Sequence, residues 1–190
     1  MRSDAARNRG RILGAARELV AAAGVDATME DIARRAGVAV GTLYRHFPAK
    51  EDLIAAVVED SIEHIAGLSE RALAAVDGGA GAGKQLGALF AAVVERHATD
   101  RALKAAAGML ENPPAADLAS APPGSATARA VTAITALLER ARSVGAVRAD
   151  LTLADLVMLL GAAPADEAPP EMRRRYVEIV LTGLSGGESS

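Results

Sequence analysis

The spacing of apolar residues is the feature that most restricts how this chain can fold. From Lys50 onward, residues such as Leu53, Ile54, Val57 and Val58 recur every three or four positions, as they do along one face of a helix. Strand-like alternation with turn dipeptides is scarce. All eight prolines fall between such stretches or at the start of one, where the missing N–H does least harm. The sequence therefore predicts an all-α protein of about nine helices.

The expected helices follow one another with short breaks. They cover about 7–23, 28–36, 40–46, 50–75, 84–99, 101–110, 125–144, 152–162 and 171–184. Thr28 with Asp31, and Thr152 with Asp155, have the spacing of N-terminal capping boxes. Gly37 ends the second helix where a backbone with positive φ is needed. Three short helices with this glycine turn predict a helix-turn-helix module.

Composition excludes several classes of protein. With 51% hydrophobic residues among 190, the chain can bury a substantial core. The absence of cysteine excludes disulfides, thiolate metal sites and a cysteine nucleophile. The three histidines are far apart without ligand spacing, so we expect no metal and no cofactor. No segment approaches the roughly 18 apolar residues that span a membrane, and we expect a cytoplasmic protein.

Positive charge gathers at the beginning of the chain. Residues 1–50 hold nine Lys and Arg against five Asp and Glu, a net +4, whereas the chain as a whole carries −3. The remaining 140 residues hold twelve against nineteen, a net −7. The first fifty residues can therefore attract a polyanion that the rest would repel.

The segment TMEDIARRAGVAVGTLYRHFPAKEDL, residues 28–53, resembles the DNA-binding signature of the TetR family of bacterial regulators. The agreement runs without a gap and includes Ile32, Ala33, Ala36-Gly37-Val38, Gly41-Thr42-Leu43-Tyr44, His46-Phe47 and Lys50. The resemblance implies that the third helix enters the major groove. It also implies a homodimer that places two such helices on a quasi-palindromic operator in double-stranded DNA.

The residue types in this segment suit two kinds of DNA contact. The candidates for base contacts are Val40, Gly41, Thr42 and Arg45. Arginine can bind guanine through two hydrogen bonds, valine or threonine can touch a thymine methyl, and glycine lets the backbone approach closely. The candidates for phosphate contacts are Thr28, Tyr44, His46 and Lys50. A cation such as Lys50 opposes the dipole at the start of a helix, which a phosphate would offset; a solvated surface lysine is the other interpretation.

Two positions depart from the family pattern. Ala39 and Ala49 stand where a Ser or Thr hydroxyl commonly caps the following helix. Each loss costs about 1 kcal/mol of helix stability. The departures concern local stability and affinity, and the predicted fold is unchanged.

The end of the chain looks like the closing region of the SbtR-like subgroup of that family. The similar residues are Ser143–Asp150, Thr152, Asp155 and Arg174–Leu184. By this resemblance the last two helices pair with their copies in a second subunit as a four-helix bundle. The expected interface residues are Leu156, Leu159, Leu160, Tyr176, Ile179, Val180 and Leu184. The alternative, that these two apolar stripes only fill the core of one subunit, stays open.

Nothing in the sequence indicates catalysis. Residues 78–84 are one residue short of a phosphate-binding loop, and Gln85 stands where a magnesium-binding Ser or Thr is required. A flexible linker explains this glycine-rich stretch, and no nucleophile or acid–base pair is recognisable. We therefore expect a protein that is not an enzyme.

The family resemblance implies a small-molecule effector in the C-terminal part. Residues suited to line its pocket are Ile65, Leu68, Phe90, Val94, Met109 and Leu110, although each also suits ordinary core. Their character predicts a largely apolar ligand. We expect a DNA-binding domain at 1–49, a ligand-sensing and dimerisation domain at 50–185 and a flexible tail at 186–190.

The expected function is ligand-responsive regulation of transcription, with a repressor released from its operator by the small molecule. Two alternatives remain. One is an activator, or a regulator without an inducer, of the same family. The other is a structural helical dimer that no longer binds DNA.

Overall fold

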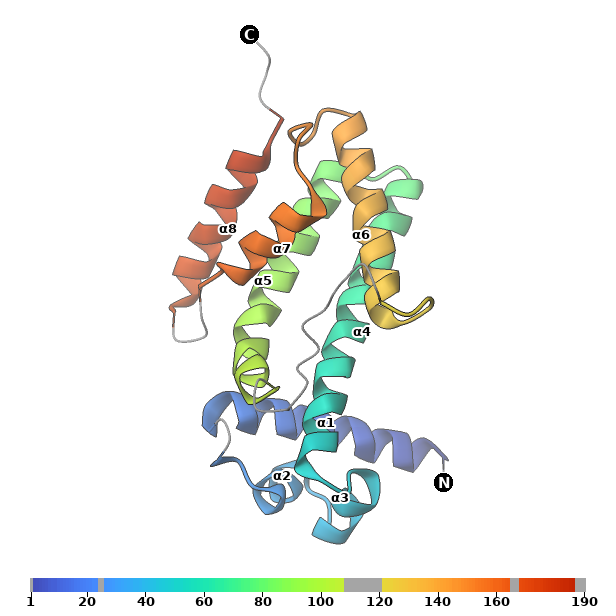
Figure 1. Ribbon diagram of the computed structural model, residues 1–190, viewed down its shortest axis with the longest axis vertical. Coiled ribbons are helices and arrows are strands. Elements are labelled where there is room, and N and C mark those ends of the chain that lie inside the picture. Colours follow the sequence, from blue (N-terminus) through green and yellow to red (C-terminus); the bar gives the residue numbers. More distant parts are fainter. Residues whose placement is uncertain (1, 24–25, 108–120, 165–167, 187–190) are drawn as a thin grey trace. The chain divides into compact units, whose positions relative to one another are not determined.

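The computed structural model describes residues 2–23, 26–107, 121–164 and 168–186 (Figure 1). Within these ranges the chain forms eight helices: α1 (Arg2–Ala23), α2 (Met29–Ala36), α3 (Val40–His46), α4 (Lys50–Asp77), α5 (Ala82–Ala107), α6 (Ala126–Ser143), α7 (Leu153–Gly161) and α8 (Pro170–Leu184). The described residues contain no β-strand, and a single antiparallel bridge joins Val147 to Ser185. The all-α prediction is confirmed.

Two helices differ from the expected bounds. Helix α5 covers both stretches that were expected as separate helices, because neither glycine nor proline interrupts residues 88–107. Helix α1 begins at Arg2, five residues earlier than expected. Asp4 lies in its first turn, where a negative charge is favourable, and pairs with Arg7 one turn further on.

The chain divides into two compact units. The first is formed by residues 1–61 and 99–115, and the second by residues 62–98 and 116–190. Helices α4 and α5 therefore contribute to both.

The core of the first unit lies between α1, α2, α3 and the beginning of α4. Its largest fully buried side chains are Ile12, Val20, Ile32, Leu43, Leu53 and Val57. Each stabilises the fold by about 1.5–3 kcal/mol through burial. Gly37 adopts the left-handed conformation, with φ 63°, and its N–H bonds to Arg34 O at 3.1 Å, which confirms the predicted turn.

The second unit has a separate apolar core, built mainly from α5, α6 and α7. Its members include Phe90, Val94, Leu137, Leu138 and Leu156. Helix α8 packs against this core with partly buried residues and has no fully buried one.

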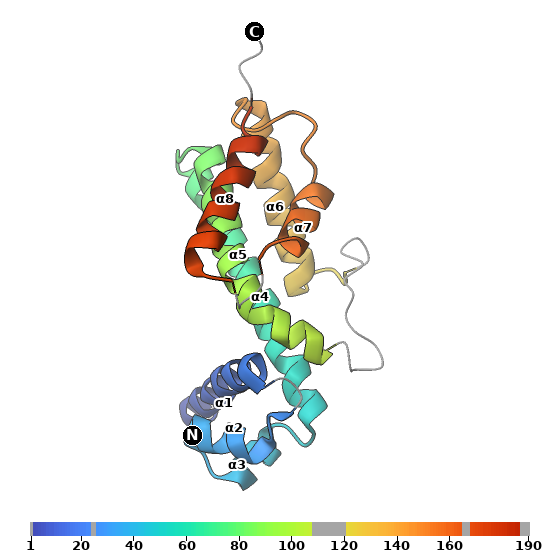
Figure 2. The same cartoon turned by 90° about the vertical axis from the view of Figure 1, so that its left-hand side faces the viewer.

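Helix α6 lies alongside the second half of α4 (Figures 1 and 2). Arg129 on α6 forms two hydrogen bonds to Glu70, at 2.8 and 2.9 Å, and also pairs with Glu63 at 2.8 Å. Its hydrogen bonds hold the pKa of the Glu70 carboxyl below its ordinary value. Further along the same two helices, Arg140 pairs with Asp77 at 2.7 Å. These pairs fix the register of α6 on α4.

Candidate DNA-binding site

Helix α3 is attached to the first unit by one buried side chain and turns its other face to solvent. Leu43 is fully buried, whereas Val40 is 39% exposed and Tyr44 is 42% exposed. Gly41 and Arg45 are also exposed, and Thr42 is half-buried. All four residues predicted to contact bases therefore lie on one short helix with side chains or backbone accessible from outside.

Gly41 is not required by the fold. A Cβ built at this position meets no atom within 4 Å, and the residue has an ordinary helical φ. Glycine inside a helix is less favourable than alanine by about 0.5–1 kcal/mol. The missing side chain leaves room for close approach of another molecule to the first turn of α3.

Arg45 folds back onto its own helix. Its Nε donates a hydrogen bond to Gly41 O at 3.1 Å, and no carboxylate pairs with it among the described residues. The two Nη groups keep their donors for another partner. The geometry is compatible with a base contact, which stays a prediction.

The residues predicted to contact phosphates lie at the ends of three consecutive helices. Thr28 caps α2: its Oγ1 accepts from Asp31 N at 3.1 Å and donates to Asp31 Oδ2 at 2.7 Å. A phosphate would therefore compete with Asp31 for the single hydroxyl proton. Tyr44 is exposed on α3, and Lys50 is half-buried as the first residue of α4.

His46 and Ala39 lie at the two ends of α3, and Ala49 directly precedes α4. The half-buried His46 ends α3, with its ring 6.3 Å from that of the buried Phe47. Ala39 provides no side-chain cap for α3, as expected from the sequence. At Ala49 the backbone N–H instead donates to Asp52 Oδ2 at 3.1 Å, which replaces part of the missing cap of α4.

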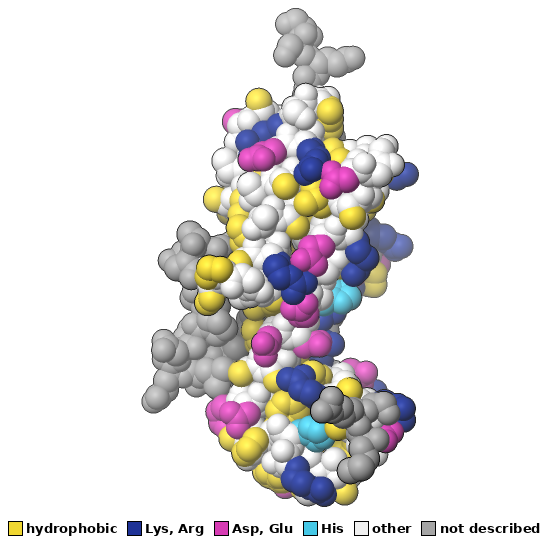
Figure 3. Space-filling view, turned by 90° about the vertical axis from the view of Figure 1, so that its right-hand side faces the viewer, with side chains coloured by type: hydrophobic (Ala, Val, Ile, Leu, Met, Phe, Trp, Pro, Cys, Tyr) yellow, Lys and Arg dark blue, Asp and Glu magenta, His cyan; other side chains and the backbone are white. Residues whose placement is uncertain are grey.

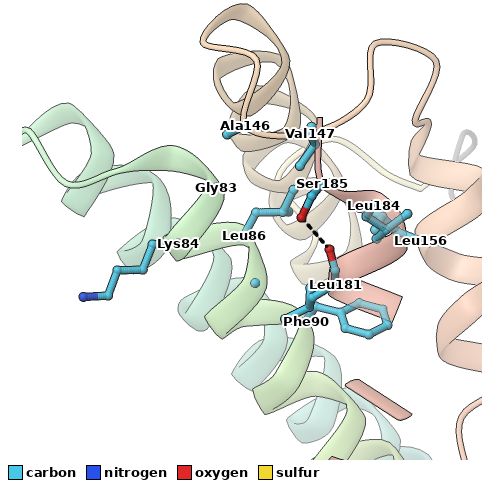
Figure 4. A pocket seen from close by; sticks show the side chains of 11 residues that line it. Gly83, Lys84, Leu86, Phe90, Ala146, Val147, Leu156, Leu181, Leu184 and Ser185 are labelled. Carbon is cyan, nitrogen blue, oxygen red and sulfur yellow. Dashed lines mark hydrogen bonds between the residues drawn. The ribbon is translucent and has the colours of Figure 1, made fainter. Parts of the chain in front are cut away.

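The second unit contains a cavity of about 310 Å³ between the start of α5, the end of α8 and the segment before α7 (Figure 4). Apolar side chains dominate its wall: Leu86, Phe90, Val147, Leu156, Leu181 and Leu184. Lys84 points away from the cavity, and the Ser185 hydroxyl donates to Leu181 O at 2.9 Å (Figure 4). The cavity therefore offers few polar groups to a ligand.

Of the residues predicted to line a ligand pocket, Phe90 lines this cavity. Val94 is fully buried in the core, and Ile65 and Leu68 pack partly buried against it. Met109 and Leu110 lie outside the described residues.

The residues predicted for a dimer interface differ in exposure. Ile179 is 57% exposed, whereas Leu156 is buried; both Leu156 and Leu184 line the cavity of their own chain. The remaining four, Leu159, Leu160, Tyr176 and Val180, are half-buried. Tyr176 Oη donates to Leu159 O at 2.6 Å, and burial raises the pKa of this phenol.

Three further apolar side chains on α7 and α8 are exposed, and sequence analysis did not single them out. They are Val157, Met158 and Met172. Together with Ile179 they give these two helices an exposed apolar surface, which is characteristic of interaction sites.

Neither a metal site nor a membrane-spanning helix is present within the described ranges. No group of three or more His, Asp or Glu side chains there is arranged to hold a metal ion. None of the helices in those ranges combines the length and apolar character needed to cross a bilayer.

The first three helices pack around a buried core and expose the short third helix, and the chain has a second helical unit. This arrangement defines a helix-turn-helix regulator. Two family models match the chain: bacterial regulatory proteins of the tetR family at residues 12–57, and the C-terminal domain of SbtR-like transcriptional regulators at residues 81–186. The chain belongs to the TetR family of DNA-binding transcriptional regulators.

Solved structures agree over nearly the whole chain. A TetR regulator from Mycobacterium vanbaalenii is 36% identical, with a TM-score of 0.73 over 97% of this chain and 98% of that one. A TetR regulator from Streptomyces coelicolor is 27% identical, with a TM-score of 0.72 over 95% and 99%. A gamma-butyrolactone receptor described as ArpA-like is 26% identical, with a TM-score of 0.60 over 95% and 90%.

A curated relative matches a shorter stretch of the chain. The HTH-type regulator TtgW from Pseudomonas putida is 46% identical over 57 residues, which are 30% of this chain and 42% of that protein. The tetR family model, at residues 12–57, contains the segment 28–53 that carries the family resemblance.

Proposed function

We propose that the protein is a ligand-responsive transcriptional repressor that acts in the cytoplasm as a homodimer. It binds a quasi-palindromic operator and is released from it by a small molecule. The observation that carries this proposal is α3, anchored by Leu43 alone and exposing Val40, Gly41 and Tyr44. We assign DNA binding to a domain at residues 1–49, and ligand sensing and dimerisation to a domain at residues 50–185.

In the proposed complex α3 enters the major groove. Val40, Thr42 and Arg45 contact base edges, and Gly41 lets the helix come close. Thr28, Tyr44, His46 and Lys50 contact phosphates and fix the position of the module without reading sequence.

The effector we propose is a small, largely apolar molecule. The apolar wall of the cavity in the second unit supports this class, because it offers few polar partners to a charged ligand. The gamma-butyrolactone receptor among the similar structures supports it as well. The ligand would act by changing the course of α4, whose residues belong to both units, with a coupling of about 1–3 kcal/mol.

DNA binding is tested by comparing Arg45→Ala with Lys50→Ala on a labelled duplex from upstream of the protein's own gene and on an unrelated duplex. Arg45→Ala should cost about 1–3 kcal/mol on the upstream duplex and little on the other, because a base contact is lost. Lys50→Ala should weaken both equally and reduce the slope of log affinity against log salt by about one unit per contact. Fluorescence anisotropy in a salt titration measures both.

The opposite pattern would contradict this placement of α3. If Arg45→Ala weakened both duplexes alike and Lys50→Ala only the upstream one, the DNA-reading residues would lie elsewhere. Failure of the unchanged protein to bind either duplex would favour a structural dimer without DNA-binding activity.

The effector is tested with a panel of small apolar compounds that includes gamma-butyrolactones. A compound that raises the melting temperature should also weaken binding to the upstream duplex about 5- to 150-fold. In the variant Leu181→Phe the larger side chain should fill the cavity and abolish both effects while DNA binding persists. Compounds that stabilise the protein but leave DNA affinity unchanged would count against an inducer.

A further inference from the structure

The arginines of the first unit differ in their partners. Four of them face carboxylates: Arg7 with Asp4, Arg17 with Asp60, Arg34 with Asp31 and Arg35 with Glu18. Because a paired guanidinium is largely neutralised by its neighbour, these four contribute little to the attraction of an external anion.

Two arginines of α1 contact the helix-turn-helix instead. Arg11 Nη2 donates to Gly37 O, in the turn between α2 and α3, at 3.3 Å. The guanidinium carbon of Arg9 lies 5.4 Å from the ring centroid of Phe47, the C-cap residue that follows α3. Over the part of the chain that the structure describes, neither arginine pairs with a carboxylate.

The position of Arg9 over the Phe47 ring supports its guanidinium group. Phe47 is buried in the core and therefore gives the guanidinium a fixed support. A cation–π contact uses the ring face and no hydrogen-bond acceptor, so most of the guanidinium N–H donors remain available to an anion. Arg9 itself is exposed, and its support follows directly on His46, one of the residues proposed to contact phosphate.

The net charge of +4 on residues 1–50 favours a polyanion as the partner of this part of the chain. In the space-filling view, Lys and Arg side chains are distributed over the face shown, with Asp and Glu side chains among them (Figure 3). Arg45 lies on α3, while Arg9 and Arg11 contact Phe47 just after α3 and the turn before it; none of the three pairs with a carboxylate among the described residues. Duplex DNA presents one negative charge about every 1.7 Å along its axis, so it can accept several separate cations at once.

We propose that Arg9 binds a DNA phosphate and thereby extends the DNA-binding surface from α3 onto α1. The proposal rests on the proposed function as a DNA-binding regulator. Arg11, held by the Gly37 carbonyl, fixes α1 against the turn and so positions Arg9. Because the contact is with phosphate, it adds affinity without sequence preference.

The test compares Arg9→Ala, Arg9→Lys and Arg7→Ala by salt titration on the upstream duplex and on an unrelated duplex of equal length. Arg7→Ala is the matched control, because it removes the same charge from the same exposed helix at a residue already paired with Asp4. Circular dichroism and melting temperatures establish that each variant is folded.

Arg9→Ala should reduce the slope of log affinity against log salt by about 0.9 per contact, or about 1.8 per dimer. At about 0.15 M salt this corresponds to roughly fivefold weaker binding per contact, equal on the two duplexes. Arg9→Lys should restore most of the slope because it keeps the charge, and Arg7→Ala should leave the slope nearly unchanged.

Two outcomes would overturn the proposal while leaving the proposed function intact. One is an unchanged slope in folded Arg9→Ala, and the other is an equal loss in Arg7→Ala. Absence of binding by the unchanged protein would instead overturn the proposed function together with this inference.

Discussion

At the scale of single residues, a substitution at Gly41 should have opposite effects on the stability of the fold and on DNA binding. The space around its Cα is open and its backbone is helical, so the fold tolerates a side chain there. We expect Gly41→Ala to stabilise the protein by about 0.5–1 kcal/mol and at the same time to weaken operator binding, because the added methyl stands between α3 and the groove. Urea unfolding and fluorescence anisotropy measure the two effects.

A matched control is Gly10→Ala on α1, where a built Cβ also meets nothing within 4 Å. It should stabilise the protein similarly and leave operator binding unchanged. Tighter or unaltered DNA binding by Gly41→Ala would show that the first turn of α3 does not approach DNA.

Single residues also differ in how well the sequence predicts their roles. Gly37, the Thr28 cap and the capping box of Thr152 with Asp155 were predicted from short spacing rules, and the structure confirms them, because turns and caps depend on neighbours in sequence. At Thr28 the structure has the side-chain cap from the predicted box, with Asp31 accepting from the Thr28 hydroxyl and not from its backbone N–H. The contact of Arg9 with Phe47 joins residues 38 positions apart. No local pattern encodes such a contact, although the excess of arginine before residue 12 was a signal that could have drawn attention to α1.

At the scale of helices, the capping box of α7 makes stability depend on pH. Thr152 Oγ1 accepts from Asp155 N at 3.2 Å, while Asp155 Oδ2 accepts from the N–H of Thr152 at 2.8 Å and from its hydroxyl at 2.6 Å. The hydrogen bond from the Thr152 hydroxyl is the largest of the effects that hold the pKa of Asp155 below its ordinary value of 3.8. A carboxyl whose pKa falls on folding stabilises the protein above that ordinary value. The stabilisation is lost as the pH falls through the lower folded value.

Thr152→Ala should therefore cost about 0.5–2 kcal/mol near pH 7, and the difference from the unchanged protein should narrow as the pH falls below the ordinary value of 3.8. Thr182→Ala is the control, since that exposed hydroxyl only donates to Glu178 O within its own helix. Urea unfolding at several pH values measures the difference. A cost that does not change in acid would mean that the Asp155 carboxylate takes no part in the cap.

The sequence did not predict the cavity. It predicted which segments are helical better than it predicted where each helix begins and ends. The continuous α5 shows why: residues 84–99 and 101–110 each looked like a helix, and only the absence of a backbone break between them decides that they are one. The cavity depends on tertiary packing of distant segments. A Cβ on Gly83 would lie 2.7 Å from Ala146 Cβ, and Val147 pairs with Ser185, so its wall joins residues about 60 to 100 positions apart in the chain. Periodicity identifies such residues as apolar without indicating which of them leave space.

At the scale of the whole molecule, the exposed apolar side chains of α7 and α8 favour assembly through these helices. The sequence predicted an interface from two apolar stripes, but Leu156 belongs to the core of its own chain, so substituting it would disturb folding as well as association. Met158, 64% exposed, and Ile179, 57% exposed, allow a cleaner experiment. An aspartate at an exposed position costs the monomer little, whereas in a dimer interface it leaves a charge buried without a partner.

The double variant Met158→Asp with Ile179→Asp should be folded and monomeric at micromolar concentration, and the unchanged protein should be dimeric. Val144→Asp is the matched control, because Val144 is a 69% exposed apolar residue outside α7 and α8. Sedimentation equilibrium gives the mass of each variant, and circular dichroism its helix content.

The monomer should also bind the upstream duplex more weakly, since a dimer engages two half-sites with one loss of translational freedom. A double variant that remains dimeric would place the interface elsewhere. A monomer that binds DNA as tightly as the unchanged protein would separate dimerisation from operator recognition.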